Sequence, residues 1–273
     1  MTGKTLLLLS GTQPGIAQAL RDRGHSLAVM DADPQAPGFA FADSCVIADV
    51  WQASDCTAAA ERYNRKIRRL DGVLLAADAP LTAASVSARL RLPGLPPHVA
   101  ELAHDRLTTR RALLSAGVSQ PWHAEIFTPQ ELQRAVIARG RDLALKSVEK
   151  SGPAAERRLT EAEDLATVFQ QVRAAAIGER VLVEQVKDPV QMPAFLMAGV
   201  CHMKADETIR ALVERAAGAL GIGDGPVVAE IAIADGTPQL AELSPRLAAE
   251  CAYLDAAVAL ACGESVSPRD LAC

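Results

Sequence analysis

The chain of 273 residues carries 28 lysines and arginines against 33 aspartates and glutamates, which gives a net charge of −5. Its length and its 49 % hydrophobic content suffice for a large core and more than one lobe. The acidic balance and the 3 % of aromatic residues argue against nucleic-acid binding, which needs a basic surface and rings for base stacking.

No apolar run reaches the roughly 18 residues of a membrane helix, and the opening run "KTLLLLS" is too short for a signal peptide. Six cysteines are scattered without a C-x-x-C pair: Cys45, Cys56, Cys201, Cys251, Cys262 and Cys273. These features predict a cytoplasmic protein with free thiols and with neither a membrane nor a nucleic-acid partner.

Residues 1–98 alternate between strand and helix patterns. Apolar runs predict strands at Thr5–Ser10, 25–33 and Leu70–Asp78, and "GTQPGIAQALRDRG" predicts a helix after the first strand. Strands that alternate with helices form a parallel sheet, so we expect an open, doubly wound α/β lobe that ends at "PGLPPH".

The loop after the first strand contains Gly11 and Gly15 but not the G-x-G-x-x-G pattern. That pattern lets a backbone approach the pyrophosphate of a dinucleotide closely. A nicotinamide-dependent enzyme is therefore the weakest of the functional hypotheses for this chain.

Three helices are expected in the middle of the chain. One spans 104–121 and stops at Gly117, and a second opens with a capping box formed by Thr128 and Glu131. "TEAEDLATVFQQV" repeats this pattern from Thr160, with Glu163 as the capping partner.

Two strands are expected among these helices, and each holds one charged residue inside an apolar run. Lys146 lies in Asp142–Val148 and Glu184 lies in Arg180–Val186. Helices on one face of an antiparallel sheet form an α+β lobe.

A helix is expected over 206–221, with Asp206 as its cap and Gly221 as its stop. The span before it, 187–205, has room for about two short strands. His202 and Lys204 in this span are expected to be surface residues, and the alternative is that they serve as replacement ligands.

The last predicted element is a hairpin, "VVAEIAIADGTPQLAELSPRLA", with one glutamate inside each strand. A two-residue turn at Asp235-Gly236 places Glu230 opposite Ala241 and away from Glu242. A three-residue connection, or one bulge, instead pairs Glu230 with Glu242 on one face.

Two facing carboxylates repel each other, and a divalent cation removes that repulsion. Mg²⁺ binds carboxylate oxygens while substrate phosphates and water complete its shell. Ser244 and Arg246 share the face of Glu242 if the strand is regular. The alternative is that both glutamates simply face solvent on an amphipathic hairpin.

The order of these features resembles the ATP-grasp superfamily, in its carboxylate–amine ligase branch near carbamoyl-phosphate synthetase and biotin carboxylase. The resemblance rests on "LPGLPPHVAELAHDRLTTRRALLSAGVSQP", "LALKSVEKSG", "VLVEQV" and "LGIGDGPVVAEIAIADGTPQLAELSPR". In the last segment the two glutamates, the turn and the arginine all match the family pattern in register.

The resemblance implies three pieces: a Rossmann-like lobe at 1–98, a small ATP-grasp lobe at 99–186 and a C-terminal lobe with the metal-binding hairpin at 187–273. It also implies an ATP-dependent ligase that converts a carboxylate to an acyl phosphate and joins it to an amine. The partners would be these small substrates, and a homodimer is open.

The resemblance implies site residues in three groups. For ATP they are Arg106, Lys146, Ser151, Gly152, Glu184, Gln185 and Val186, of which the backbone of the last two would bond adenine. For Mg²⁺ or Mn²⁺ they are Glu230, Glu242 and Ser244. Arg246 would stabilise the charge of the transferring γ-phosphate.

The sequence departs from the family pattern in ways that favour a second hypothesis, a non-catalytic nucleotide-binding or partner-binding relative. Arg106 replaces a lysine, and Ser244 replaces an asparagine. The residues after Gly152 leave fewer backbone N–H groups for a phosphate. The span 187–205 is shorter than in relatives. The acid and amine substrates are not readable from the sequence.

Overall fold

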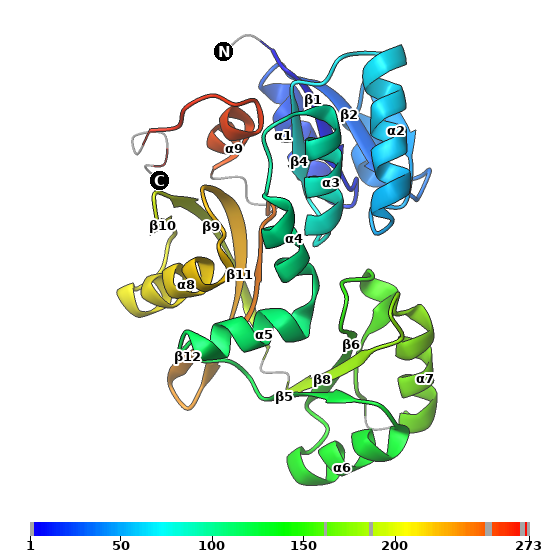
Figure 1. The fold of residues 1–273 in the computed structure, drawn as a ribbon, viewed down its shortest axis with the longest axis vertical. Coiled ribbons are helices and arrows are strands. Elements are labelled where there is room, and N and C mark those ends of the chain that lie inside the picture. The colour runs from blue at the N-terminus through cyan, green and yellow to red at the C-terminus, as the bar shows by residue number, and fades with distance from the viewer. Residues whose placement is uncertain (1–2, 161–162, 186–187, 249–252, 268–270, 272–273) are drawn as a thin grey trace.

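The computed structural model describes residues 3–160, 163–185, 188–248, 253–267 and 271. Within these residues the strands form three four-stranded sheets, and Figure 1 shows them as three bodies joined by the α4–α5 segment. None of the described helices is long and apolar enough to cross a membrane. Of the six cysteines, four are unpaired, and Cys251 and Cys273 lie outside the described residues.

The first sheet is parallel and has the strand order β3-β2-β1-β4. Its strands are β1 (Thr5–Leu9), β2 (Ser26–Asp31), β3 (Ser44–Ile47) and β4 (Gly72–Leu75). The parallel sheet confirms the expected α/β lobe, whereas β3 was not expected, because its residues alternate between half-buried and exposed positions and give no apolar run.

Helices cover both faces of this sheet because the leucines of β1 point alternately to its two sides. Leu6 and Leu8 pack with α1 (Pro14–Asp22). Leu7 packs with α2 (Ala53–Lys66), and α3 (Pro80–Leu90) joins the same core. This double covering is the doubly wound arrangement that the sequence predicts.

The C-terminal helix α9 (Leu254–Ala261) also packs on the first sheet. Its Leu254 and Val258 share a core with Leu6 and Leu74. The division of the chain at residues 98 and 186 remains a prediction, but α9 and Leu271 contribute to the core of the first lobe.

The second sheet is antiparallel, with the order β5-β8-β6-β7. Its strands are β5 (His123–Ile126), β6 (Leu143–Ser147), β7 (Glu156–Arg158) and β8 (Val181–Gln185). Helices α6 (Pro129–Arg139) and α7 (Leu165–Ala175) pack on it through a shared apolar core. The expected capping box of Thr128 and Glu131 opens α6.

The prediction that Thr160 caps the second of these helices was wrong. Asp164 caps α7 instead, by accepting a hydrogen bond from the backbone N–H of Thr167 at 2.9 Å. The backbone N–H of Thr160 does donate to Glu163 at 2.9 Å. Thr160 nevertheless does not cap the helix, because Asp164 occupies the capping position and lies nearer to the apolar stripe.

The third sheet is antiparallel, with the order β10-β9-β11-β12. Its strands are β9 (Val190–Met197), β10 (Val200–His202), β11 (Gly225–Ala234) and β12 (Thr237–Ser244). Helix α8 (Glu207–Leu220) covers it, capped by Asp206 and ended by Gly221 in the left-handed conformation, as expected.

The helix expected at 104–121 corresponds to α5 (Arg106–Ser115), and α4 (Pro97–His104), which was not expected, precedes it. They break at Asp105, whose side chain caps α5 by accepting from the backbone N–H of Thr108 at 2.7 Å. Figure 1 shows α5 between the second and third sheets. This placement brings its first turn to the space where the two antiparallel sheets face each other.

Candidate functional site

The hairpin of β11 and β12 combines both of the connections considered above. Ala234 pairs with Thr237 across a two-residue turn, and the register then shifts between Glu230 and Ile231. Because the shift leaves one extra residue on β12, Glu230 pairs with Glu242. The two carboxylates therefore lie on one face, as a metal site requires.

Three cations surround the buried carboxylate of Glu242. Lys150 Nζ lies 2.8 Å from its Oε1. Arg106 Nε and Lys146 Nζ each lie 3.9 Å from one of its oxygens. Burial alone would raise the Glu242 pKa, but these positive charges hold it well below its usual range.

The pKa of Glu230 is shifted in the opposite direction to that of Glu242. Burial and the neighbouring charge of Glu242 raise its pKa. Among the described residues, its side chain accepts a hydrogen bond from Gln191 Nε2, which lies 2.9 Å from its Oε1. Glu230 is the acid of the pair that lacks a cation in direct contact, so an added positive charge would be bound most favourably beside it.

A second buried ion pair lies behind the first. Both oxygens of Glu184 contact cations, Arg110 NH2 at 2.5 Å and Lys146 Nζ at 2.7 Å. Arg110 follows Arg106 by one helical turn, so both guanidinium groups leave the same face of α5. Burial would raise the pKa of Glu184, but Lys146 and Arg110 lower it.

The first lobe contributes Asp78 to the site. Its carboxylate lies 2.6 Å from Lys150 Nζ, and that lysine therefore links Asp78 to Glu242. Burial, opposed by Lys150 and helped by Glu242, raises the pKa of Asp78 to about 6. Side chains from all three sheets thus meet at one charge network.

The raised pKa of Asp78 predicts a pH dependence of stability. A carboxyl whose folded-state pKa exceeds its unfolded value of 3.8 stabilises the fold most below pH 4, and that contribution is lost as pH rises through about 6. Asp78→Asn removes this titration. The free energy of unfolding of the variant, relative to the unmodified protein, should therefore rise by up to about 3 kcal/mol between pH 4 and pH 7. Urea unfolding across this range measures it, and a pH-independent difference would contradict the assignment.

The space between the second and third sheets forms a cleft of about 210 Å³. One wall carries Lys146 and Glu184, and the other carries Glu230. The cleft has charged residues of the network at one end, and Gln185, Pro189 and Ala232 also line it. That combination suits a ligand with a charged tail and a flat ring.

The chain is similar to known proteins in its structure and not detectably in its sequence family. No family model matches the chain, and no curated protein matches it either. Carboxyaminoimidazole ribonucleotide synthase from Aspergillus clavatus complexed with ATP superposes with a TM-score of 0.70 at 15 % identity, over 98 % of this chain and 79 % of that one. Phosphoribosylglycinamide synthetase from Anaerococcus prevotii gives 0.63 at 17 %, over 96 % and 76 %.

L-amino acid ligase from Bacillus licheniformis gives a TM-score of 0.64 at 20 % identity, over 90 % of this chain and 68 % of that one. The chain has the ATP-grasp fold. Within the ATP-grasp fold, the second and third sheets are the two antiparallel walls that the sequence resemblance predicts, and the parallel sheet is the preceding Rossmann-like lobe.

The ATP-grasp fold brings five of the predicted site residues together. Glu230 pairs with Glu242, and Arg106, Lys146 and Glu184 lie around them. Sequence reasoning missed four further members of the network: Asp78, Arg110, Lys150 and Glu156. Only Arg110 had a local signal, its spacing of four residues from Arg106 on one helix.

Ser151 and Gly152 make close contacts that fix the conformation of their own loop. The Ser151 hydroxyl donates to the carbonyl of Glu149 at 2.9 Å and accepts from the backbone N–H of Ile177 at 3.1 Å. Gly152 has a φ of +95°, and an added Cβ would lie 2.8 Å from Nε1 of Trp51. The binding role of both residues stays a prediction.

The backbone N–H of Gln185 donates to the carbonyl of Trp122 at 2.8 Å. That N–H is therefore engaged in a hydrogen bond, and the expected contact of the Gln185 backbone with adenine stays a prediction. Val186, the other expected hinge residue, lies outside the described residues.

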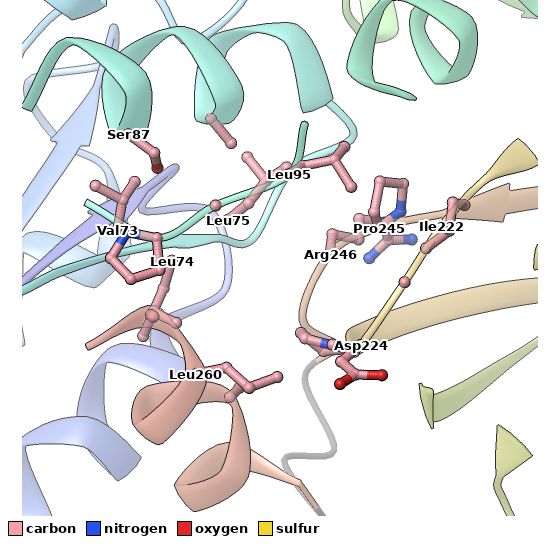
Figure 2. Close-up of a pocket in the computed structure, with 18 of the residues that line it drawn as sticks. Val73, Leu74, Leu75, Ser87, Leu95, Ile222, Asp224, Pro245, Arg246 and Leu260 are labelled. Carbon is pink, nitrogen blue, oxygen red and sulfur yellow. The ribbon is translucent and has the colours of Figure 1, made fainter. Parts of the chain in front are cut away.

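The charge of Arg246 reaches the network, where it opposes the rise in the Glu230 pKa that burial causes. Ser244 is buried opposite Val228. Arg246 makes no ion pair among the described residues and lines a separate cavity beyond the end of β12 (Figure 2). The roles assigned to both residues remain predictions.

The hairpin suits a metal that arrives with a nucleotide. The described residues contain no group of three or more histidine, cysteine, aspartate or glutamate side chains placed to hold an ion. Glu230 and Glu242 supply two carboxylates, the number that Mg²⁺ commonly takes when phosphates and waters complete its shell. The under-compensated charge of Glu230 fits such an ion.

The glycine loop of the first lobe does not suit a dinucleotide. The backbone N–H of Gly11 already donates to Asp31 Oδ2 at 2.7 Å, and Asp31 is buried. The backbone of Gly11 also packs closely on Gly38: a Cβ added to Gly38 would lie 2.8 Å from the Gly11 carbonyl oxygen. A pyrophosphate at this loop would meet a carboxylate and a closed backbone.

Proposed function

We propose that the chain is an ATP-dependent ligase that activates a small carboxylate as an acyl phosphate and joins it to an amine. The observation that carries this proposal is the Glu230–Glu242 pair facing Lys146 and Lys150 at the end of a cleft between two antiparallel sheets. Structures with the same fold include an L-amino acid ligase and a synthase complexed with ATP.

The cations of the cleft would bind the phosphates of ATP. Lys146, Lys150 and Arg106 surround Glu242. When Glu242 also binds Mg²⁺, the positive charges at the site exceed the negative ones and would attract phosphates. Mg²⁺, held by Glu230 and Glu242, would neutralise charge on the phosphate oxygens. Positioning and charge neutralisation are the main contributions that a protein makes to phosphoryl transfer.

The proposed reaction has two balanced steps. A carboxylate oxygen of the first substrate attacks the γ-phosphorus of ATP, and the bond to the bridging oxygen breaks to release ADP. The amine nitrogen then attacks the acyl carbon, phosphate leaves, and the amine loses a proton as the amide forms. Arg106 and Lys146 would stabilise the charge on the phosphoryl oxygens in the first step.

A non-catalytic nucleotide-binding relative is the second candidate, favoured by the closure of the charge network. Each of the cations Arg106, Arg110, Lys146 and Lys150 already contacts an acid. The cleft of about 210 Å³ is also smaller than the roughly 300–1,000 Å³ of ordinary ligand pockets. Nucleotide binding therefore requires the two sheets to separate and the ion pairs to exchange.

The experiment that tests the proposal compares ligands by thermal unfolding. ATP with Mg²⁺ should raise the midpoint of unfolding, whereas NAD should leave it unchanged. ADP formation with carboxylates in the presence of hydroxylamine, which traps acyl phosphates as hydroxamates, tests catalysis. Stabilisation without hydroxamate from any acid would favour the non-catalytic relative, and no stabilisation by ATP would overturn both proposals.

A further inference from the structure

A cavity of about 420 Å³ lies between the first and third sheets, away from the charge network. It is twice the size of the cleft between the antiparallel sheets. Most of its wall is aliphatic and comes from β4, the linker before α4, the end of α8 and α9: Val73, Leu74, Leu75, Leu95, Ile222 and Leu260. Figure 2 shows the β4 side chains and Leu260 on one side and Ile222 on the other.

One cation enters this apolar cavity. Arg246 lies two residues beyond the end of β12, and Figure 2 shows its guanidinium group beside Pro245. Among the described residues its buried Nε has no hydrogen-bond partner, and its NH1 donates to the carbonyl of Leu247 at 3.3 Å. No acid among these residues forms an ion pair with Arg246, so the cavity wall carries a positive charge without an acid in direct contact.

We infer that this cavity binds the acid substrate, and that the acid is a monocarboxylate with an unbranched or branched aliphatic body. The inference rests on the proposed ligase function. The aliphatic wall receives the hydrocarbon part, and the Arg246 guanidinium binds the carboxylate in the fork geometry that arginine offers. Arg246 follows β12, the strand that carries Glu242, and its charge acts on Glu230, so a carboxylate bound to it would lie near the metal hairpin.

The charges at the cavity limit the ligand to one negative charge. Arg246 supplies a single positive charge, and Asp224 lies at the exposed rim with Oδ1 held by the backbone N–H of Ala198 at 2.7 Å. A dianion such as a sugar phosphate or a dicarboxylate would bring a second negative charge against Asp224 or against the apolar wall. Either position disfavours binding.

Isothermal titration of the whole chain with three six-carbon probes tests the inference. Hexanoate should bind, hexanamide should bind at least about tenfold more weakly because it lacks the charge, and adipate should also bind more weakly because its second carboxylate is not neutralised. Arg246→Gln should remove the preference for hexanoate over hexanamide. Equal binding of the three probes, or no binding, would overturn the inference.

A matched pair of variants tests the location. Leu260→Trp fills the cavity and should reduce hexanoate affinity about tenfold or more, whereas Leu114→Trp, at a position that is 70 % exposed on α5, should not change it. Equal effects of the two variants would place the acid elsewhere. Circular dichroism of both establishes that they are folded.

The same samples separate this inference from the proposed ligase. ATP–Mg²⁺ binding without hexanoate binding would overturn the cavity assignment and leave the ligase proposal standing. Hexanoate binding without ATP–Mg²⁺ binding would keep the cavity as an acid site and remove the ligase. If both bind, hexanoate-dependent hydroxamate formation identifies the acid as the substrate, and its absence overturns that identification.

Discussion

Glu242→Gln is expected to abolish ATP-dependent turnover and also to lower the free energy of unfolding by about 3–5 kcal/mol. The carboxylate compensates Lys150 at 2.8 Å and faces Lys146 and Arg106, each at 3.9 Å. The amide keeps the shape but removes the charge, which leaves three buried cations close together. Loss of one partner of a buried pair is costly because the remaining charge is poorly solvated.

Glu230→Gln is the matched control for this result. Its carboxylate is repelled by Glu242 and accepts a hydrogen bond from Gln191 that the amide oxygen can also accept. Turnover should fall as in Glu242→Gln because a metal ligand is lost, but the unfolding free energy should stay constant or rise by about 1 kcal/mol. Urea unfolding and ADP formation measure the two quantities, and equal destabilisation by both variants would contradict this account of the network.

The hairpin shows how far the sequence could predict this site. Alternation of apolar residues and the Asp235-Gly236 turn predict two paired strands, and both are present. Whether Glu230 and Glu242 lie on the same face depended on a β-bulge. The alternation of residues in "QLAELS" does not indicate where a bulge lies. Only the resemblance to a family with both glutamates in register favoured the pairing that the structure has.

The rest of the network could not be predicted, because its members are distant in sequence. Asp78 and Glu242 meet through Lys150, and the three residues come from different lobes. Lys150 lies in the loop three residues after β6, as many solvated lysines do, and its burial depends on the docking of the first lobe. Arg246, which the resemblance also selects, lines the cavity beyond β12, and its expected role remains a prediction.

Arg110→Met is expected to lower the free energy of unfolding by about 3–5 kcal/mol. Arg110 NH2 lies 2.5 Å from Glu184 Oε2, and the side chains of both residues are buried, with exposed fractions of 5 % and 7 %. The variant leaves Glu184 with Lys146 alone. Arg89→Met is the matched control, since its pair with Glu61 is 57 % and 42 % exposed, and its loss should cost under about 1 kcal/mol.

The double variant Arg110→Met/Glu184→Gln decides whether this buried pair serves the fold or the ligand. It removes both charges together, so most of the stability lost in Arg110→Met should return. A carboxylate has about four acceptor positions, and Glu184 uses only some of them on its two cations, which leaves capacity for ribose hydroxyls. If Glu184 contacts nucleotide, the double variant should regain its unfolding midpoint yet bind ATP–Mg²⁺ about tenfold more weakly. Unchanged ATP affinity in a variant of restored stability would make the pair a support for α5 against β8 and would leave nucleotide recognition to Lys146 and the metal hairpin.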